Sequence, residues 1–163
     1  MREAGVTKEH AIVFLADAGH ISDVTVIDEN AASIGFKFMG WPITLFTYED
    51  DPNFLFLRCS YVLDDTIRNE LEVLRTLARI QDRAKVAKLS ASIAEAEVSA
   101  TAELFLPACA DFAAVFWRSV DVVARVASEA HDELNSTGAA EVAAERFTEE
   151  LEAELHLKKP DGD

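Results

Sequence analysis

Between residues 85 and 106, apolar and polar residues alternate with a period of two in two runs, separated by a short polar break. Successive side chains of a strand point to opposite faces, so this pattern predicts a β-hairpin with one apolar and one polar face. An apolar sheet face is buried by packing against another layer, and we therefore expect helices on that side. The apolar positions are Ala87, Leu89, Ala91 and Ile93 in the first strand and Val98, Ala100, Ala102, Leu104 and Leu106 in the second.

Residues 20–63 are also β-rich. A short strand is expected at 24–27, and longer alternating segments follow at 34–39, 43–48 and 54–63. The turn-forming residues between them are the polar turn 28–30, the Gly-Trp-Pro break at 40–42 and the hairpin loop at 49–53.

The strand at 54–63 is apolar on both faces. One face carries Leu55, Leu57, Cys59, Tyr61 and Leu63, while Phe54, Phe56 and Val62 lie on the other, and the neighbouring strand adds Phe46 and Tyr48. A single layer of helices cannot cover both faces. We therefore expect the face with Phe46, Phe54 and Phe56 to be an interaction surface. The alternative is that a C-terminal helix covers it within the same chain.

Four helices are expected. The first spans Thr7–Ala18, with Thr7 as N-cap and Gly19 at its end. The second spans Asp64–Gln81, with Asp64 or Asp65 as its cap. The third spans Pro107–Leu134, with Pro107 in its first turn, and the residues from Asn135 to Gly138 are expected to end it. The fourth spans Ala139–Leu157. The stripe that we expect to be buried in the second helix consists of Ile67, Leu71, Leu74 and Ala78, supported by Leu77.

This pattern predicts an α+β fold, with an antiparallel sheet covered on one face by helices in the order α-β-β-β-α-β-β-α and an extra C-terminal helix. Residues 1–134 form the domain, 139–157 the amphipathic helix and 158–163 a frayed tail. The fourth helix is expected to dock on its own domain or on a partner subunit through Phe147, Leu151 and Leu155, because an isolated helix of this length is marginal in water. The expected partner-binding residues are Phe46, Phe54, Phe56, Trp117, Phe147 and Leu151.

Composition narrows the class of protein. The chain has 163 residues, which suits one domain, and 50% hydrophobic residues, which excludes a wholly disordered chain. The net charge of −15 disfavours binding to nucleic acid or to an anionic membrane. The simplest interpretation of this charge is that it keeps the protein soluble. The alternative is that the protein keeps an aggregation-prone or basic partner in solution. The absence of a signal-peptide pattern, of long apolar runs and of a disulfide-type cysteine spacing predicts a reduced, cytoplasmic protein.

No catalytic or metal-binding constellation stands out, so we expect no enzyme activity, cofactor or metal. None of the four histidines has a partner at a metal-ligand spacing. Cys59 lies on an apolar strand face, which fits a buried structural thiol. Cys109 lies near a helix N-terminus, which can lower the pKa of a thiol, so a nucleophilic Cys109 is kept as an alternative. The acidic residues 49–51 suit a hairpin tip better than a calcium site. Trp41 fits a packing aromatic, with ligand binding as the alternative.

The order of elements, with the segment Phe54–Leu63 before a helix, resembles the YbjN-type proteins, which share the fold of type III secretion chaperones. The run Val86–Leu106 followed by a long helix is similar to the second half of that fold. The resemblance covers residues 8–134, and the helix at 139–157 departs from it. It implies a bacterial protein of the kind described as sensory transduction regulators, and it implies no catalytic residues. Strong acidity and small size are also typical of secretion chaperones.

These observations favour a non-enzymatic interaction module, chaperone-like or regulatory, that forms a homodimer and binds a client protein or peptide. The surplus apolar surface on the third helix and on the Phe54 hairpin is the reason to expect a dimer. The alternative is a small-ligand-binding protein or an enzyme with a pocket between sheet and helix, near Trp41 and Tyr61. A structural role in a complex is a third interpretation.

Overall fold

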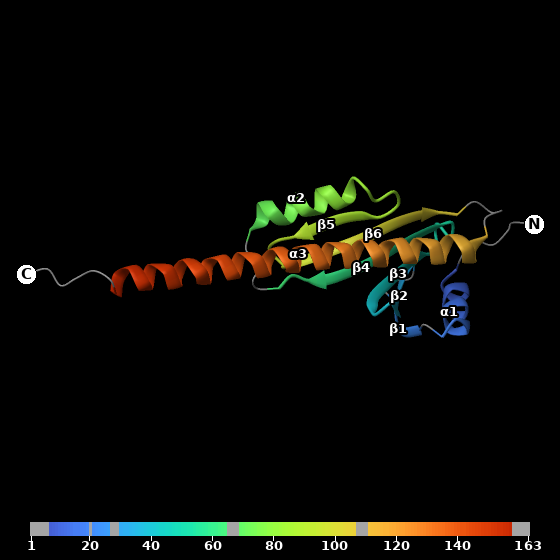
Figure 1. Cartoon of the computed structure of the whole chain (residues 1–163). Coiled ribbons are helices and arrows are strands. Elements are labelled where there is room, and N and C mark those ends of the chain that lie inside the picture. The colour runs from blue at the N-terminus through green and yellow to red at the C-terminus, as the bar shows by residue number, and fades with distance from the viewer. Residues whose placement is uncertain (1–6, 20, 27–29, 65–68, 107–110, 158–163) are drawn as a thin grey trace, which may run out of the picture.

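A computed structural model describes residues 7–19, 21–26, 30–64, 69–106 and 111–157, with backbone alone for 21–23, 26 and 137–157. Three predictions lie outside these residues: Pro107 in the first turn of a helix, the candidate nucleophile Cys109 and the frayed tail 158–163. Within the described residues, the chain folds into one six-stranded antiparallel sheet and three helices that pack against it (Figure 1). The predicted α+β class is therefore confirmed.

The sheet has the strand order β1-β2-β3-β4-β6-β5. The first four strands form a meander. The predicted order had three strands before the second helix, whereas the structure has four, because the short segment near residue 24 forms a strand of its own, β1. The elements are α1 Lys8–Asp17, β1 Ile21–Val26, β2 Ala31–Phe38, β3 Trp41–Tyr48, β4 Phe54–Val62, α2 Glu70–Gln81, β5 Lys88–Ser92, β6 Glu97–Phe105 and α3 Phe112–Leu157.

All three helices cover the same face of the sheet. Helix α3 packs across β2, β3, β4 and β6, and α2 lies beside it over β5. The largest fully buried side chains come from the helices and from this one sheet face, as the alternation in the sequence predicts. They include Leu15 of α1, Phe36 and Leu57 of the sheet, Ile80 of α2 and Phe116 of α3.

Local signals explain where the first two helices begin. The hydroxyl oxygen of Thr7 accepts a hydrogen bond of 3.4 Å from the backbone N–H of His10, which confirms the predicted N-cap of α1. Helix α2 begins later than predicted, at Glu70. Its N-cap is Asn69, whose side-chain oxygen accepts a hydrogen bond of 3.2 Å from the backbone N–H of Glu72. Asp64, one of the two predicted caps, lies outside the helix, and 65–68 lie outside the described residues.

The predicted buried stripe of α2 is wrong for Leu71, Leu74 and Ala78, which are exposed, and Ile67 lies outside the described residues. Leu77 is buried as predicted, together with Val73 and Ile80. The helix carries two apolar stripes, and long-range contacts choose between them. In the observed rotation, Arg79 of α2 forms an ion pair with Glu133 of α3. Arg83, two residues after the end of α2, forms ion pairs with both Glu129 and Glu133.

The predicted break between a third and a fourth helix is also wrong, because α3 is one continuous helix of 46 residues. Asn, Ser, Thr and Gly are poor helix formers, but each costs no more than about 1 kcal/mol relative to Ala. A helix that is already nucleated by packing can continue through them. The hydroxyl of Ser136 donates a hydrogen bond of 2.8 Å to the carbonyl oxygen of Glu133, a local bond that fits within the helix.

Residues 137–157 of α3, which we call the arm, extend past the end of the sheet in Figure 1. The arm therefore does not fold back on its own domain. Within the described part of the chain, no helix combines the length and apolar composition that a membrane crossing requires.

Candidate functional site

The face of the sheet opposite the helices, here called the open face, carries a cluster of five aromatic side chains. Strand pairing sets Phe46 beside Phe56 and Phe54 beside Phe105. Ring centroids are 5.6 Å apart for Phe46 and Phe56, 5.5 Å for Tyr48 and Phe54, and 5.0 Å for Phe54 and Phe105. The structure thus brings together the three phenylalanines predicted for this surface. We call Phe46, Tyr48, Phe54, Phe56 and Phe105 the open-face cluster.

Phe105 was missed in the sequence, although a signal was present. The alternation that buries Leu104 and Leu106 places Phe105 on the opposite face, together with Glu103. Its side chain is 72% exposed, which is unusual for such a large apolar group.

Polar groups occupy the other half of the open face. Arg58 forms an ion pair with Glu97 and donates a hydrogen bond of 2.8 Å to the hydroxyl of Ser60. Hydrogen bonds from Ser99 and then from Arg58 hold the pKa of Glu97 below its ordinary value. By strand register the charged residues of this face are Lys37, Arg58 and Lys88 against Asp23, Glu97 and Glu103, so the face is balanced while the whole chain carries −15.

The arm does not cover the open face of its own chain. Helix α3 lies on the opposite side of the sheet, and the arm continues its direction beyond the sheet (Figure 1). The alternative in which a C-terminal helix buries the phenylalanines within one chain is therefore contradicted.

The remaining predicted partner-binding residues lie elsewhere. Trp117 is half-buried on the helix side of the sheet, with its ring centroid 5.9 Å from Phe38 and 5.1 Å from Phe116. It belongs to an aromatic cluster that joins α1, β2 and α3 and is not brought together with the open face. Phe147, Leu151 and Leu155 lie on the arm, where the structure describes the backbone.

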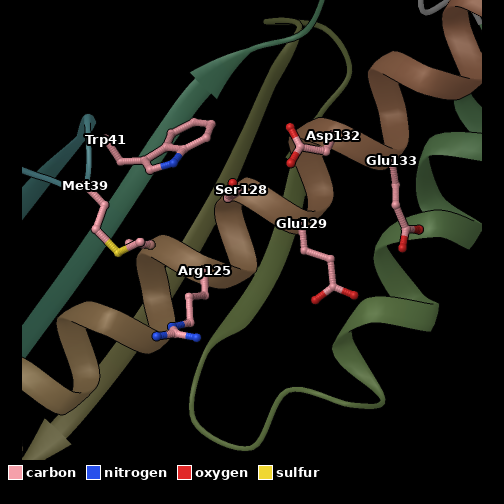
Figure 2. A pocket seen from close by; sticks show the side chains of 8 residues that line it. Met39, Trp41, Arg125, Ser128, Glu129, Asp132 and Glu133 are labelled. Atoms are coloured by element: carbon pink, nitrogen blue, oxygen red, sulfur yellow. The ribbon is translucent and has the colours of Figure 1, made fainter.

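A second candidate site is a groove of about 440 Å³ between the β2–β3 turn and α3 (Figure 2). Trp41 forms part of its wall, close to where the alternative small-ligand pocket was expected. Behind it, the His131 ring lies edge-on to the rings of Trp41 and Tyr61, with centroids 5.3 Å away in each case. The residues lining the groove are Met39, Trp41, Ala124, Arg125, Ser128, Glu129, Asp132 and Glu133.

Tyr61, the other predicted pocket residue, does not line this groove. Its hydroxyl is buried and lacks a hydrogen-bond partner among the described residues. Burial is the main reason that its pKa is raised well above the ordinary value for tyrosine. Tyr61 is therefore a neutral packing residue beneath His131.

Cys59 is fully buried, and burial raises the pKa of its thiol to about 11. The thiolate is the reactive form, and it is populated only as the pH approaches that value. In a Cys109→Ser background, we expect Cys59 to resist alkylation at about pH 8 in the folded protein and to react within minutes in denaturant. Rapid labelling of the folded protein would contradict this assignment of a structural thiol.

Within the described residues, no group of three or more His, Cys, Asp or Glu side chains is placed to hold a metal ion. No protein-family model and no curated protein matches the chain. One solved structure is similar, an uncharacterized protein from Methanothermobacter thermautotrophicus, with a TM-score of 0.60 and 14% sequence identity. The match covers 80% of this chain and 97% of that one, and at this identity it shows the fold alone.

Proposed function

We propose that this protein is a non-enzymatic protein–protein interaction module, chaperone-like or regulatory, that forms a homodimer and binds a partner polypeptide. The observation that carries the proposal is the open-face cluster, which none of the three described helices covers. Burying a phenylalanine contributes roughly 1.5–3 kcal/mol relative to leaving it exposed. An aromatic cluster on an open sheet face is therefore typical of an interaction surface.

The size of the open face supports a second copy of the chain as its occupant. Six strands span five spacings of about 4.8 Å, and strands of about eight residues rise about 3.3 Å per residue, which gives roughly 650 Å². Two such faces packed together bury roughly 1,300 Å², within the range of about 1,200–2,000 Å² found for specific interfaces.

The charge distribution supports the same occupant. Two chains of net charge −15 repel one another over most of their surfaces. The open face is balanced between three basic and three acidic positions, and Arg58 and Lys88 are each paired with a carboxylate on that face. Two copies can thus approach through this face with less repulsion than through the acidic remainder.

We assign partner binding to the arm. Its sequence places Phe147, Leu151 and Leu155 on a helix that is otherwise dominated by glutamates, and such a helix suits a partner with a basic, apolar surface. We further propose that the chain is a YbjN-type protein, whose regulatory label fits this class of function. A reducing, cytoplasmic location is supported by the free, buried thiol of Cys59.

The test is the double variant Phe54→Ser with Phe56→Ser. We expect the wild-type protein to have the mass of a dimer by light scattering at micromolar concentration, and the variant to have the mass of a folded monomer with near-normal thermal stability. The matched control is Leu71→Ser with Leu74→Ser, which removes two exposed leucines from α2 and should leave the dimer intact. A monomeric wild-type protein, or global unfolding of the phenylalanine variant, would refute the proposal.

A further inference from the structure

The groove beside Trp41 has one apolar wall, built by the β2–β3 turn. Met39 and Gly40 both have positive φ angles, 52° and 84°, which is typical of a two-residue type I′ hairpin turn. The turn presents Met39, which is 65% exposed, next to the half-buried indole of Trp41. Indole is the best aromatic surface for contact with a cation, and thioethers adapt to ligands of different shape.

The other wall is α3, and most of its charges are already neutralised. Arg125 pairs with Asp121 at 2.9 Å. Glu129 pairs with Arg83, and Glu133 pairs with both Arg79 and Arg83. Asp132 is different, because it has no Lys or Arg partner in the described part of the chain. Its Oδ1 atom lies 3.3 Å from Nδ1 of His131.

Figure 2 shows how these groups are directed. The carboxylate of Asp132 points to the side of the groove that Trp41 occupies, with Ser128 between them on the helix surface. The guanidinium of Arg125 points away from both, and Glu133 points towards α2. The uncompensated charge that faces the indole is therefore negative.

We propose that this groove binds an organic cation, an alkyl ammonium or guanidinium group, between the indole of Trp41 and the carboxylate of Asp132. The negative face of the indole attracts a cation, and a charge-assisted hydrogen bond to the carboxylate adds to that attraction. The volume of about 440 Å³ accommodates such a head group with a short alkyl stem. A bare divalent cation would require several oxygen ligands, whereas the groove offers one uncompensated carboxylate and an aromatic ring.

The same chemical group occurs in free polyamines or agmatine and in the side chains of lysine and arginine. Both sources can be compared directly. The groove lies on the helix side of the sheet, so cation binding does not depend on the self-association proposed for the open face.

The experiment is a calorimetric titration with agmatine and with a short peptide that contains one arginine, each against its neutral analogue. We expect saturable binding of the cationic ligands and none of the neutral ones. Trp41→Leu and Asp132→Asn should each weaken binding by about tenfold or more. Glu70→Gln removes the same charge from an exposed position on α2 outside the groove, and it should change nothing.

Each outcome decides the proposal. Tighter binding of agmatine identifies a free cation as the ligand source, tighter binding of the peptide identifies a polypeptide side chain, and equal affinity supports recognition of the cationic group alone. Absence of saturable binding, or the same affinity in Asp132→Asn as in Glu70→Gln, overturns it. If Trp41→Leu does not fold, Asp132→Asn still decides, because Asp132 is exposed and has no ion-pair partner with Lys or Arg among the described residues. The Phe54→Ser, Phe56→Ser variant should bind the cation like the wild type, which separates the two proposals.

Discussion

Replacing Phe116 by alanine is expected to lower the free energy of unfolding by about 3–5 kcal/mol. The side chain is fully buried in α3, and its loss leaves a cavity at the point where α1, β2 and α3 meet. The measurement is denaturant-induced unfolding. Its ring lies 5.5 Å from that of Phe14, 6.1 Å from Phe36, 5.3 Å from Phe112 and 5.1 Å from Trp117.

Phe105→Ala is the matched control, because it removes the same group from a side chain that is 72% exposed on the open face. We expect its effect on the unfolding of the monomer to be within about 0.5 kcal/mol. Both variants should be compared at a concentration where they have the same mass, since Phe105 belongs to the proposed dimer surface. Equal losses of stability would show that the open face is part of the core.

Replacing Gly138 by proline is expected to disconnect the arm from the rest of α3. The arm lies beyond the sheet, so its helix depends on continuing from the packed part of α3 (Figure 1). Proline removes a backbone donor and clashes with the preceding turn, at a cost of about 3 kcal/mol. An arm of this length would then have to nucleate alone, which is unfavourable in water.

The measurement is circular dichroism at the helical minimum, together with hydrogen exchange of the arm amides. Gly138→Pro should lose helical signal and exchange protection in the arm, while the thermal unfolding of the sheet and of α1 and α2 stays close to that of the wild type. Gly138→Ala is the control and should favour the helix by about 1 kcal/mol. Unchanged protection of the arm in the proline variant would mean that a partner subunit holds it.

The two faces of the sheet could be predicted from the sequence alone. In β4 and β6, alternation assigns every second residue to the helix side, and Leu55, Leu57, Ala100 and Leu104 are buried as expected. The same alternation sends Phe54 and Phe56 to the open face. A strand needs no further information, because its period of two maps position directly onto face.

The helices needed the tertiary structure. In α2, two apolar stripes competed, and packing against β5 and α3 decided that Val73, Leu77 and Ile80 are buried. The end of α3 was misjudged because weak helix formers between 135 and 138 cost less than the renucleation of a separate helix. Differences in helix propensity amount to about 1 kcal/mol or less per residue here, so tertiary packing and the cost of starting a new helix outweigh them.

The groove also depended on tertiary structure. Trp41 and Asp132 are far apart in the sequence, and both line the groove because α3 crosses the sheet next to the β2–β3 turn. Which carboxylate remains uncompensated is decided in the same way, since Arg79 of α2 and Arg83 just after it pair with Glu129 and Glu133 of α3. In the strands, the period of two determined which side chains point towards the core. The long-range packing of α2 and α3 determined which residues of α2 are buried and which polar groups lie together at the surface.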